Sequence, residues 1–162
     1  MGIRFLSAAL FLLISWNAEA QNSSVKLDRS SFYAALSNGD IDKLNDQIKK
    51  IGQTSFEEKN AFVGVLKMRE AEFAKGLKNK LDLFKSGGHQ LEDEIAKHKS
   101  NGEYRFLRLI IQENAPSILN YNNNIEEDVK LVKASYPKLP KETQAAILDY
   151  CKKSKVLKAK DF

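Results

Sequence analysis

Apolar residues recur along the chain at spacings of three and four, the period of a helix that buries one face. Two such runs are Ile41, Leu44, Ile48 and Ile51, then Phe62, Val65, Leu66 and Phe73. Runs of alternating β-branched residues and hairpin dipeptides between them, the usual signs of strands, are missing from the sequence. The pattern predicts an all-α fold of six or seven antiparallel helices. They form either a compact bundle or a short stack of αα-hairpins.

Caps and helix-breaking residues set the expected helix bounds. Gly39 can adopt the left-handed conformation that ends a helix, and Asp40 can cap the next one. Glu57 and Glu58 fall in the positively polarised first turn of the third helix. The expected helices are residues 31–37, 41–51, one beginning after Thr54 or Ser55, 77–98, one within 101–116, one capped by Asn123 or Asn124 and ended by Pro137, and 140–153.

The fourth helix contains Gly87-Gly88, which would ordinarily indicate a break. The apolar stripe nevertheless keeps its phase through the glycines, with members Leu77, Leu81, Phe84, Gly88, Leu91 and Ile95. A loop of arbitrary length would usually lose that phase. We therefore predict one helix over 77–98, with Gly88 on the buried stripe where another helix approaches closely. A kink at the glycine pair is the alternative, because each glycine costs about 1 kcal/mol relative to alanine in a helix.

The N-terminus has the features of a signal peptide. Arg4 is followed by the apolar run Phe5–Trp16, which is shorter than the roughly 20 residues that span a bilayer. Ala18-Glu19-Ala20 is a small-residue cleavage site. We expect cleavage after Ala20 and export to a bacterial periplasm or the extracellular space.

About 142 residues follow the expected cleavage, enough for one domain with a sizeable core. We expect a disordered lead over 21–30, a helical domain over 31–153 and a basic tail over 154–162. The net charge of +5 is concentrated at the end of the chain, where residues 150–162 hold five lysines and one aspartate. A frayed, solvated end is the expected state of this tail, and contact with an anionic membrane surface is the alternative. Aromatic residues are not interleaved with these lysines, so nucleic acid is not an expected partner.

Cys151 is the only cysteine. An intrachain disulfide is therefore impossible, and in an oxidising compartment the thiol is either buried or available to another molecule. Four residues separate it from Ile147, which places it on the apolar side of the last helix and favours burial.

Motifs for catalysis, metals and cofactors are missing from the sequence. His89 and His98 lie about 2.5 helical turns apart and face roughly opposite sides, and neither H-E-x-x-H nor C-x-x-C occurs. G-x-S-x-G and glycine-rich phosphate loops are missing as well. We therefore expect no metal, no cofactor and no enzymatic activity. Two carboxylates far apart in the sequence can meet in space, so a small hydrolase acting on envelope material is the alternative.

The segment NGEYRFLRLIIQENAP, residues 101–116, threads charged side chains through an apolar centre. On a helical wheel, Arg105, Arg108 and Gln112 form one narrow ridge. The end residues Glu103, Glu113 and Asn114 point into the apolar arc, where we expect them to cap helix ends and form ion pairs. The ridge is the candidate binding site for a ligand or peptide, because guanidinium groups suit an anionic group.

Two resemblances bear on this region. LEDEIAKHKSNGEYRFLRL, residues 91–109, resembles the junction between two tetratricopeptide units, with Lys99 where that family has a proline before the turn. EYRFLRLIIQENAP resembles a group of small, exported, uncharacterised bacterial proteins, and this likeness extends over most of the chain after residue 20. The resemblances imply an αα-repeat-like helical fold and export.

These observations together favour an exported, non-enzymatic module that binds a protein, peptide or other ligand. The small hydrolase and a peripheral membrane protein that uses the basic tail are the alternatives. The sequence indicates neither the specific partner nor the oligomeric state.

Overall fold

A computed structural model describes residues 27–56 and 59–162. Over these ranges the fold consists of helices without strands, which confirms the predicted all-α class. The expected signal peptide, residues 21–26 of the expected lead, and Glu57 and Glu58 lie outside the described residues. Among the helices that are described, none combines the length and the apolar character needed to cross a bilayer.

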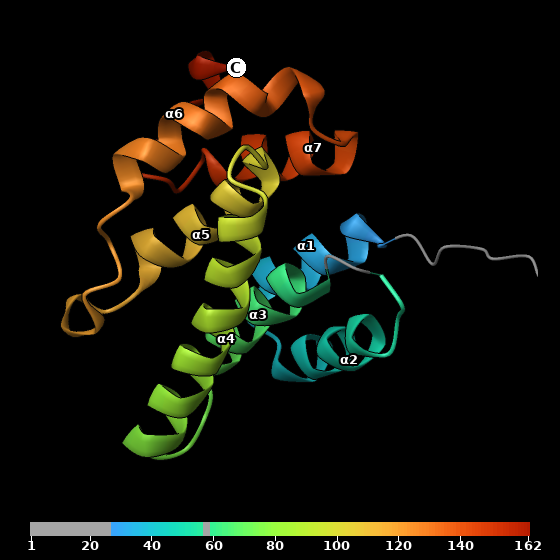
Figure 1. Cartoon of the computed structure of the whole chain (residues 1–162), viewed down its shortest axis with the longest axis vertical. Helices are drawn as coiled ribbons and strands as arrows, with labels where there is room; N and C mark the ends of the chain where they lie inside the picture. The colour runs from blue at the N-terminus through green and yellow to red at the C-terminus, as the bar shows by residue number, and fades with distance from the viewer. Residues whose placement is uncertain (1–26, 57–58) are drawn as a thin grey trace, which may run out of the picture.

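The described residues form seven α-helices and three 3-10 helices, which follow one another with short connections (Figure 1). The α-helices are α1 (Arg29–Asn38), α2 (Ile41–Gly52), α3 (Lys59–Glu70), α4 (Leu77–Lys97), α5 (Gly102–Asn114), α6 (Ile125–Ser135) and α7 (Lys141–Tyr150). The 3-10 helices are η1 (Ser117–Leu119), η2 (Tyr136–Lys138) and η3 (Ala159–Asp161).

The α1–α2 boundary forms as the sequence predicts. Gly39 adopts a left-handed φ of 65° and ends α1, and the Asp40 side chain accepts hydrogen bonds from the first-turn amides of α2. The start of α1 differs from the prediction, because Asp28 caps the helix by accepting from the Ser31 amide. Arg29 and Ser30 are therefore helical, although we expected them in the disordered lead.

Helix α4 runs unbroken through Gly87-Gly88 and packs along α3, as Figure 1 shows. A Cβ at Gly87 would lie only 2.4 Å from the Gly64 carbonyl oxygen, and a Cβ at Gly64 would lie 2.6 Å from the Gly87 carbonyl oxygen. At Gly88 the nearest atom would be 3.5 Å away, on the Met68 side chain, which is an ordinary contact. The close helix approach is thus real, but Gly87 rather than Gly88 makes it.

Helix α5 is the centre of the fold, with ten of its 13 residues buried. Asn101 caps it by accepting from the amides of Glu103 and Tyr104. Its Phe106 lies in an aromatic cluster with Tyr33 of α1 and Tyr150 of α7. Helices from both ends of the chain therefore pack on α5.

The C-terminal segment differs from the frayed tail that we expected. Leu157 is fully buried, and the Phe162 ring lies 4.6 Å from the Tyr136 ring. The Lys133 ammonium pairs with Asp161 at 3.0 Å. An apolar contact with η2 and an ion pair with α6 therefore hold residues 154–162 against the domain.

Cys151 is free and buried at the end of α7. Burial raises the pKa of its thiol above the ordinary value, so the thiolate form is disfavoured there.

Candidate functional site

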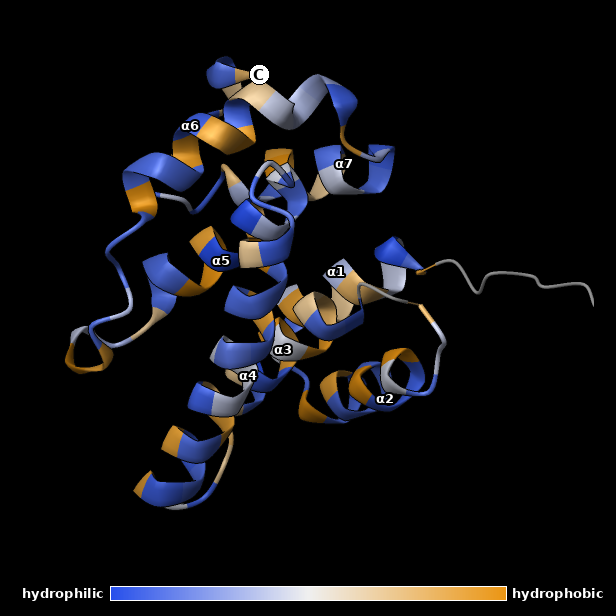
Figure 2. Ribbon diagram, in the orientation of Figure 1, coloured by the Kyte–Doolittle hydropathy of each residue, from blue (hydrophilic) through white to orange (hydrophobic). Residues whose placement is uncertain are grey.

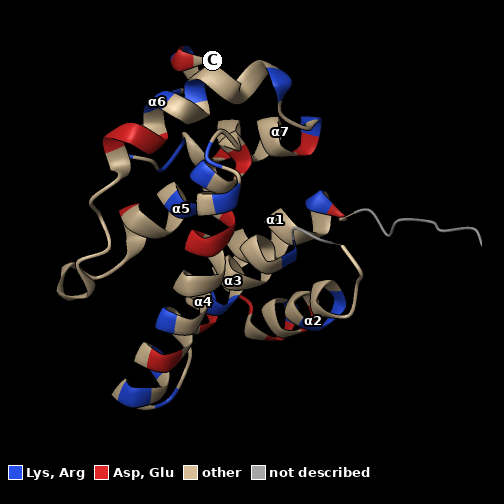
Figure 3. Ribbon diagram, in the orientation of Figure 1, with Lys and Arg blue, Asp and Glu red and all other residues tan. Residues whose placement is uncertain are grey.

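The predicted ridge on α5 lies under the acidic first turn of α6 (Figure 3). Asp128 of α6 is completely buried and receives hydrogen bonds from both ridge arginines. The Arg108 guanidinium binds it through two nitrogens, at 2.8 and 2.7 Å, and Arg105 donates through one nitrogen at 3.1 Å. The carboxylate therefore fixes both guanidinium groups between α5 and α6.

A second carboxylate extends this cluster to α4. Glu92 accepts a hydrogen bond from Arg108 at 2.8 Å and another from the Tyr121 hydroxyl. Burial lowers the pKa of Arg108, but the hydrogen bonds and charges of Asp128 and Glu92 outweigh that effect and hold the pKa above its ordinary value. Burial and the adjacent Glu92 both raise the pKa of Tyr121. Arg108 is therefore a charged, fully engaged link between three segments.

The ridge as a whole is buried rather than open. Arg105, Arg108 and Gln112 have exposed fractions of 6%, 4% and 4%. Arg105 is further held by Glu127 at 3.1 Å and by the Lys99 carbonyl oxygen at 3.0 Å, whereas the Gln112 Oε1 atom accepts no hydrogen bond from the described residues. A binding role for the ridge stays a prediction, and the structure gives its arginines an architectural use.

Of the two carboxylates near the ends of α5, Glu103 forms an ion pair as the wheel suggested, whereas Glu113 forms none with a described residue and accepts from a hydroxyl and a backbone amide instead. Glu103 is buried and accepts from Arg29 of α1 through three hydrogen bonds, from the Tyr33 hydroxyl at 2.9 Å and from Thr143 of α7 at 2.7 Å. Burial, together with Glu103, raises the pKa of Tyr33 well above its ordinary value. At the other end, Glu113 accepts from the Ser154 hydroxyl at 2.6 Å.

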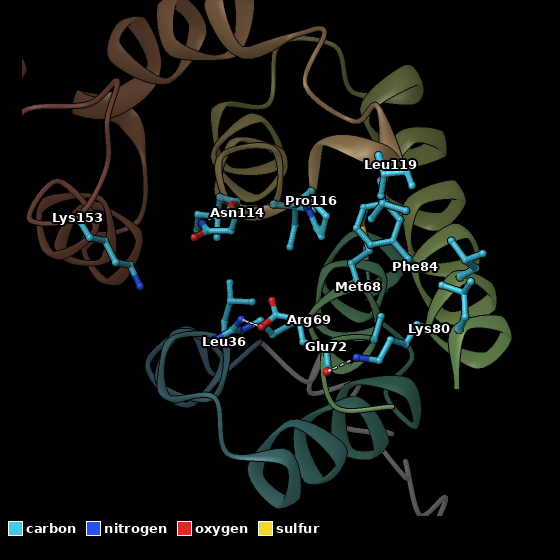
Figure 4. Close-up of a pocket in the computed structure, with 17 residues that line it drawn as sticks. Leu36, Met68, Arg69, Glu72, Lys80, Phe84, Asn114, Pro116, Leu119 and Lys153 are labelled. Carbon is cyan, nitrogen blue, oxygen red and sulfur yellow. Dashed lines mark hydrogen bonds and ion pairs between the residues drawn. The ribbon is translucent and has the colours of Figure 1, made fainter. Parts of the chain in front are cut away.

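A groove opens on the opposite flank of α5, between its C-terminal turn and the α3–α4 pair (Figure 4). Its cavity volume is about 350 Å³, within the range of roughly 300–1,000 Å³ typical of ligand sites. Aliphatic, thioether and aromatic side chains make up most of the lining, among them Met68, Leu81, Phe84, Ile111, Ala115 and Leu119. The first half of the α4 stripe thus faces this groove rather than the closed core.

Two large apolar side chains stand exposed at the rim. Leu77, the first residue of α4, is 75% exposed, and Ile118 of η1 is 90% exposed. Figure 2 shows the corresponding hydrophobic colour at the first turn of α4 and in the loop after α5. Ile118 lies three residues after Ala115, in a short turn held by Pro116, which keeps it out of the core.

Charged side chains sit at the edges of the groove. Arg69 forms an ion pair with Glu72, and Lys80 donates to the Glu72 backbone oxygen at 3.1 Å, as the dashed lines in Figure 4 mark. Lys153 enters from the other side, with its ammonium 5.4 Å from the centre of the Tyr150 ring. The lining therefore carries three cations against one carboxylate.

A second cavity, of about 310 Å³, adjoins the groove between α1, α5 and α7. Leu36, Ile110 and Lys153 line both spaces, so the two lie next to each other at these residues. The second cavity also contains Glu142 and Asp149, two carboxylates on α7.

Neither space displays a catalytic arrangement. Across residues 27–56 and 59–162, no three His, Cys, Asp or Glu side chains come close enough together to hold a metal ion. His89 and His98 line neither cavity. Asp149 accepts a hydrogen bond from Lys152, which lowers the pKa of its carboxyl group, whereas a glycosidase general acid needs a raised pKa.

The groove residues were not identified as a site from the sequence, because an apolar residue that lines a groove has the same period as one in the core. An isolated Ile118-Leu119 pair between Pro116 and an asparagine run was the one signal available. No family model, curated protein or solved structure shows significant similarity to the chain, so its function must be inferred from these residues and their geometry.

Proposed function

We propose that the protein is an exported, non-enzymatic binding protein that holds a small amphipathic molecule in the groove between α5, η1 and the α3–α4 pair. The observation that carries the proposal is an apolar cavity of about 350 Å³ whose rim exposes Leu77 and Ile118. Exposed apolar side chains that cluster around a concavity are typical of binding sites, whereas isolated ones are common on any surface.

The chemistry of the lining supports binding rather than catalysis. Apolar side chains form the floor, and the polar groups lie at the edges, where they can orient a ligand without reacting with it. Asn114 is an example: its amide nitrogen donates to the Ile110 carbonyl oxygen at 2.7 Å and to the Tyr150 hydroxyl at 3.1 Å. It therefore stiffens the groove wall.

Competition for an apolar fluorophore tests this proposal. 1-N-phenylnaphthylamine is neutral and brightens in apolar surroundings, so it should bind the purified protein with a saturable increase in emission. Leu81→Trp replaces an aliphatic side chain of the groove with a bulkier indole ring and should abolish most of the increase in emission. Leu148→Trp makes the same exchange on α7 at a position 40% exposed that lines neither cavity, and should leave binding unchanged.

Two outcomes would count against a groove site. Equal binding by both tryptophan variants would place the fluorophore elsewhere, and no saturable binding by the wild type would remove the proposal. Circular dichroism of each variant separates loss of binding from loss of fold.

Export is tested on the chain itself. We expect the protein recovered from outside the cytoplasm to begin at Gln21, which intact-mass measurement would detect. A protein that begins at Met1 would contradict cleavage after Ala20.

A further inference from the structure

We infer that the ligand of the groove is a long-chain carboxylate, with its hydrocarbon tail along the apolar floor and its carboxylate at the ammonium of Lys153. This inference rests on the proposed binding function and adds the chemical class of the ligand.

Of the three residues that line both cavities, Lys153 is the only charged one. Leu36 and Ile110, the other two shared residues, are apolar. Figure 4 shows the Lys153 side chain extending from the end of α7 toward the open groove, across from Phe84 and Lys80. An anionic group bound there would lie at the end of the apolar floor, with the hydrocarbon pointing toward Leu77 and Ile118.

The other two cations of the lining each have a hydrogen-bond partner in the protein. Arg69 pairs with the Glu72 carboxylate, and Lys80 donates to the Glu72 backbone oxygen. Lys153 forms no ion pair with a described residue: its ammonium lies against the Tyr150 ring and interacts with the Asp149 carboxylate only at longer range. A ring face attracts a cation but cannot neutralise it, so this ammonium can accept an anionic partner.

The carboxylates in the second cavity determine how the ligand is oriented and which charge its head group carries. Glu142 and Asp149 line that space, and Asp149 is paired with Lys152 at 2.7 Å. A carboxylate would be repelled by Glu142 and would stop at Lys153, whereas a cationic head would meet in the groove only the Glu72 carboxylate, which Arg69 already binds. The anionic end of the ligand therefore belongs at the junction.

Lys153, the one lining ammonium without a hydrogen-bond partner among the described residues, also selects among anions. Phosphate groups carry more charge and are usually bound by several cationic donors or by forked guanidinium groups. Arg69 is the one guanidinium in the lining, and Glu72 already binds it. One lysine next to an extended aliphatic floor suits a monoanion with a hydrocarbon chain.

Three probes with the same twelve-carbon chain test the assignment: dodecanoate, dodecanol and dodecyltrimethylammonium. Each competes with 1-N-phenylnaphthylamine below its micelle concentration. Dodecanoate should displace the fluorophore at a concentration about fivefold lower than dodecanol, because one partly solvated charge pair contributes about 1 kcal/mol. Dodecyltrimethylammonium should be the weakest of the three.

Lys153→Met keeps the length of the side chain and removes the charge. The substitution should weaken the binding of dodecanoate by about fivefold and leave the binding of dodecanol unchanged. Lys160→Met is the matched control, since Lys160 is exposed, carries the same charge and lines neither cavity. It should leave all three probes unaffected.

The outcomes separate the two proposals. If the fluorophore binds but dodecanoate is no better than dodecanol, or if both methionine variants behave alike, the carboxylate assignment is wrong while the groove stands. Displacement by an apolar peptide such as FLSAALFLLISW and not by dodecanoate would assign the groove to a polypeptide. Concentration-dependent dimerisation that Ile118→Ser abolishes would assign it to a second copy of this chain.

Discussion

The two flanks of α5 use their residues in opposite ways. On the flank toward α6, Arg105 and Arg108 are buried around Asp128. On the flank toward η1, Ile110 and Ile111 help to line a groove whose rim leaves Ile118 almost fully exposed. One flank therefore buries charged side chains, and the other exposes apolar ones. Each flank departs from the usual distribution, and each departure has a different physical consequence.

On the charged flank the consequence concerns stability and specificity. Buried ion pairs often add little net stability, but removing one partner leaves an uncompensated buried charge. On the apolar flank the consequence concerns binding, because exposed aliphatic surface gains free energy when a ligand covers it. Substitutions on the two flanks should therefore separate folding effects from binding effects.

The largest effect is expected for Asp128→Asn. This change keeps the shape of the side chain but leaves two buried guanidinium groups without their shared carboxylate. We expect a loss of about 3–5 kcal/mol in the free energy of unfolding, measured by urea titration. Glu127→Gln is the control, because its side chain is 58% exposed while it also pairs with Arg105; it should cost less than about 1 kcal/mol. Similar losses for both would show that the buried position of Asp128 does not matter.

The next effect concerns the close contact between α3 and α4. Gly87→Ala places a Cβ 2.4 Å from the Gly64 carbonyl oxygen, so the helices must separate. We expect a loss of about 2–3 kcal/mol in urea unfolding. Gly88→Ala meets only ordinary contacts and should stabilise the protein by about 0.5–1 kcal/mol, because alanine favours a helix over glycine. A stable Gly87→Ala variant would mean that α3 and α4 do not pack this closely.

A moderate effect is expected for Tyr121→Phe on the charged flank. Loss of the hydrogen bond to Glu92 should cost about 1 kcal/mol at pH 8. Burial and Glu92 raise the pKa of Tyr121 above its ordinary value of 10.0, so the folded state keeps a proton that the unfolded state releases. The stabilising contribution is complete below pH 10 and declines as the pH rises further. Urea titrations from pH 8 to 11 should give a shallower decline for Tyr121→Phe than for the wild type, and parallel curves would contradict this assignment.

The smallest effect on stability is expected for Ile118→Ser at the groove rim. Because Ile118 is 90% exposed, the free energy of unfolding should change by less than about 0.5 kcal/mol. Binding of 1-N-phenylnaphthylamine should nevertheless weaken, since the ligand loses part of its apolar cover. A large loss of stability without a loss of binding would show that this loop belongs to the core.

Sequence periodicity predicted the helical class and the continuity of α4, because both depend on local spacing. The wheel also grouped Arg105, Arg108 and Gln112 correctly on one face of α5. It could not show which helix covers that face, since Asp128 reads as an ordinary first-turn acid of α6. The tertiary fold determines the partner of the ridge, since Asp128 lies 20 residues from Arg108 in the chain.

The groove and the packed C-terminus were missed for a related reason. Leu81 and Phe84 have the period of core residues, and only the path of the loop after Ala115 leaves a space over them. At the C-terminus, the lysine-rich composition of 154–162 suggested solvation, whereas the spacing of Leu157 and Phe162 determines where the segment packs. Composition described the solvent-facing side chains and gave no information on the few that anchor the segment.

The Glu103 cluster affects when the centre of the protein can fold. Its partners Arg29, Tyr33 and Thr143 lie 74, 70 and 40 positions away along the chain, and contacts of such long range form late. During synthesis from the N-terminus, the carboxylate emerges long before Thr143, so the centre of the fold cannot close until α7 has been made. We expect a chain that ends at Tyr136 to remain sensitive to proteases. Such late closure would leave the growing chain open until most of it has been made.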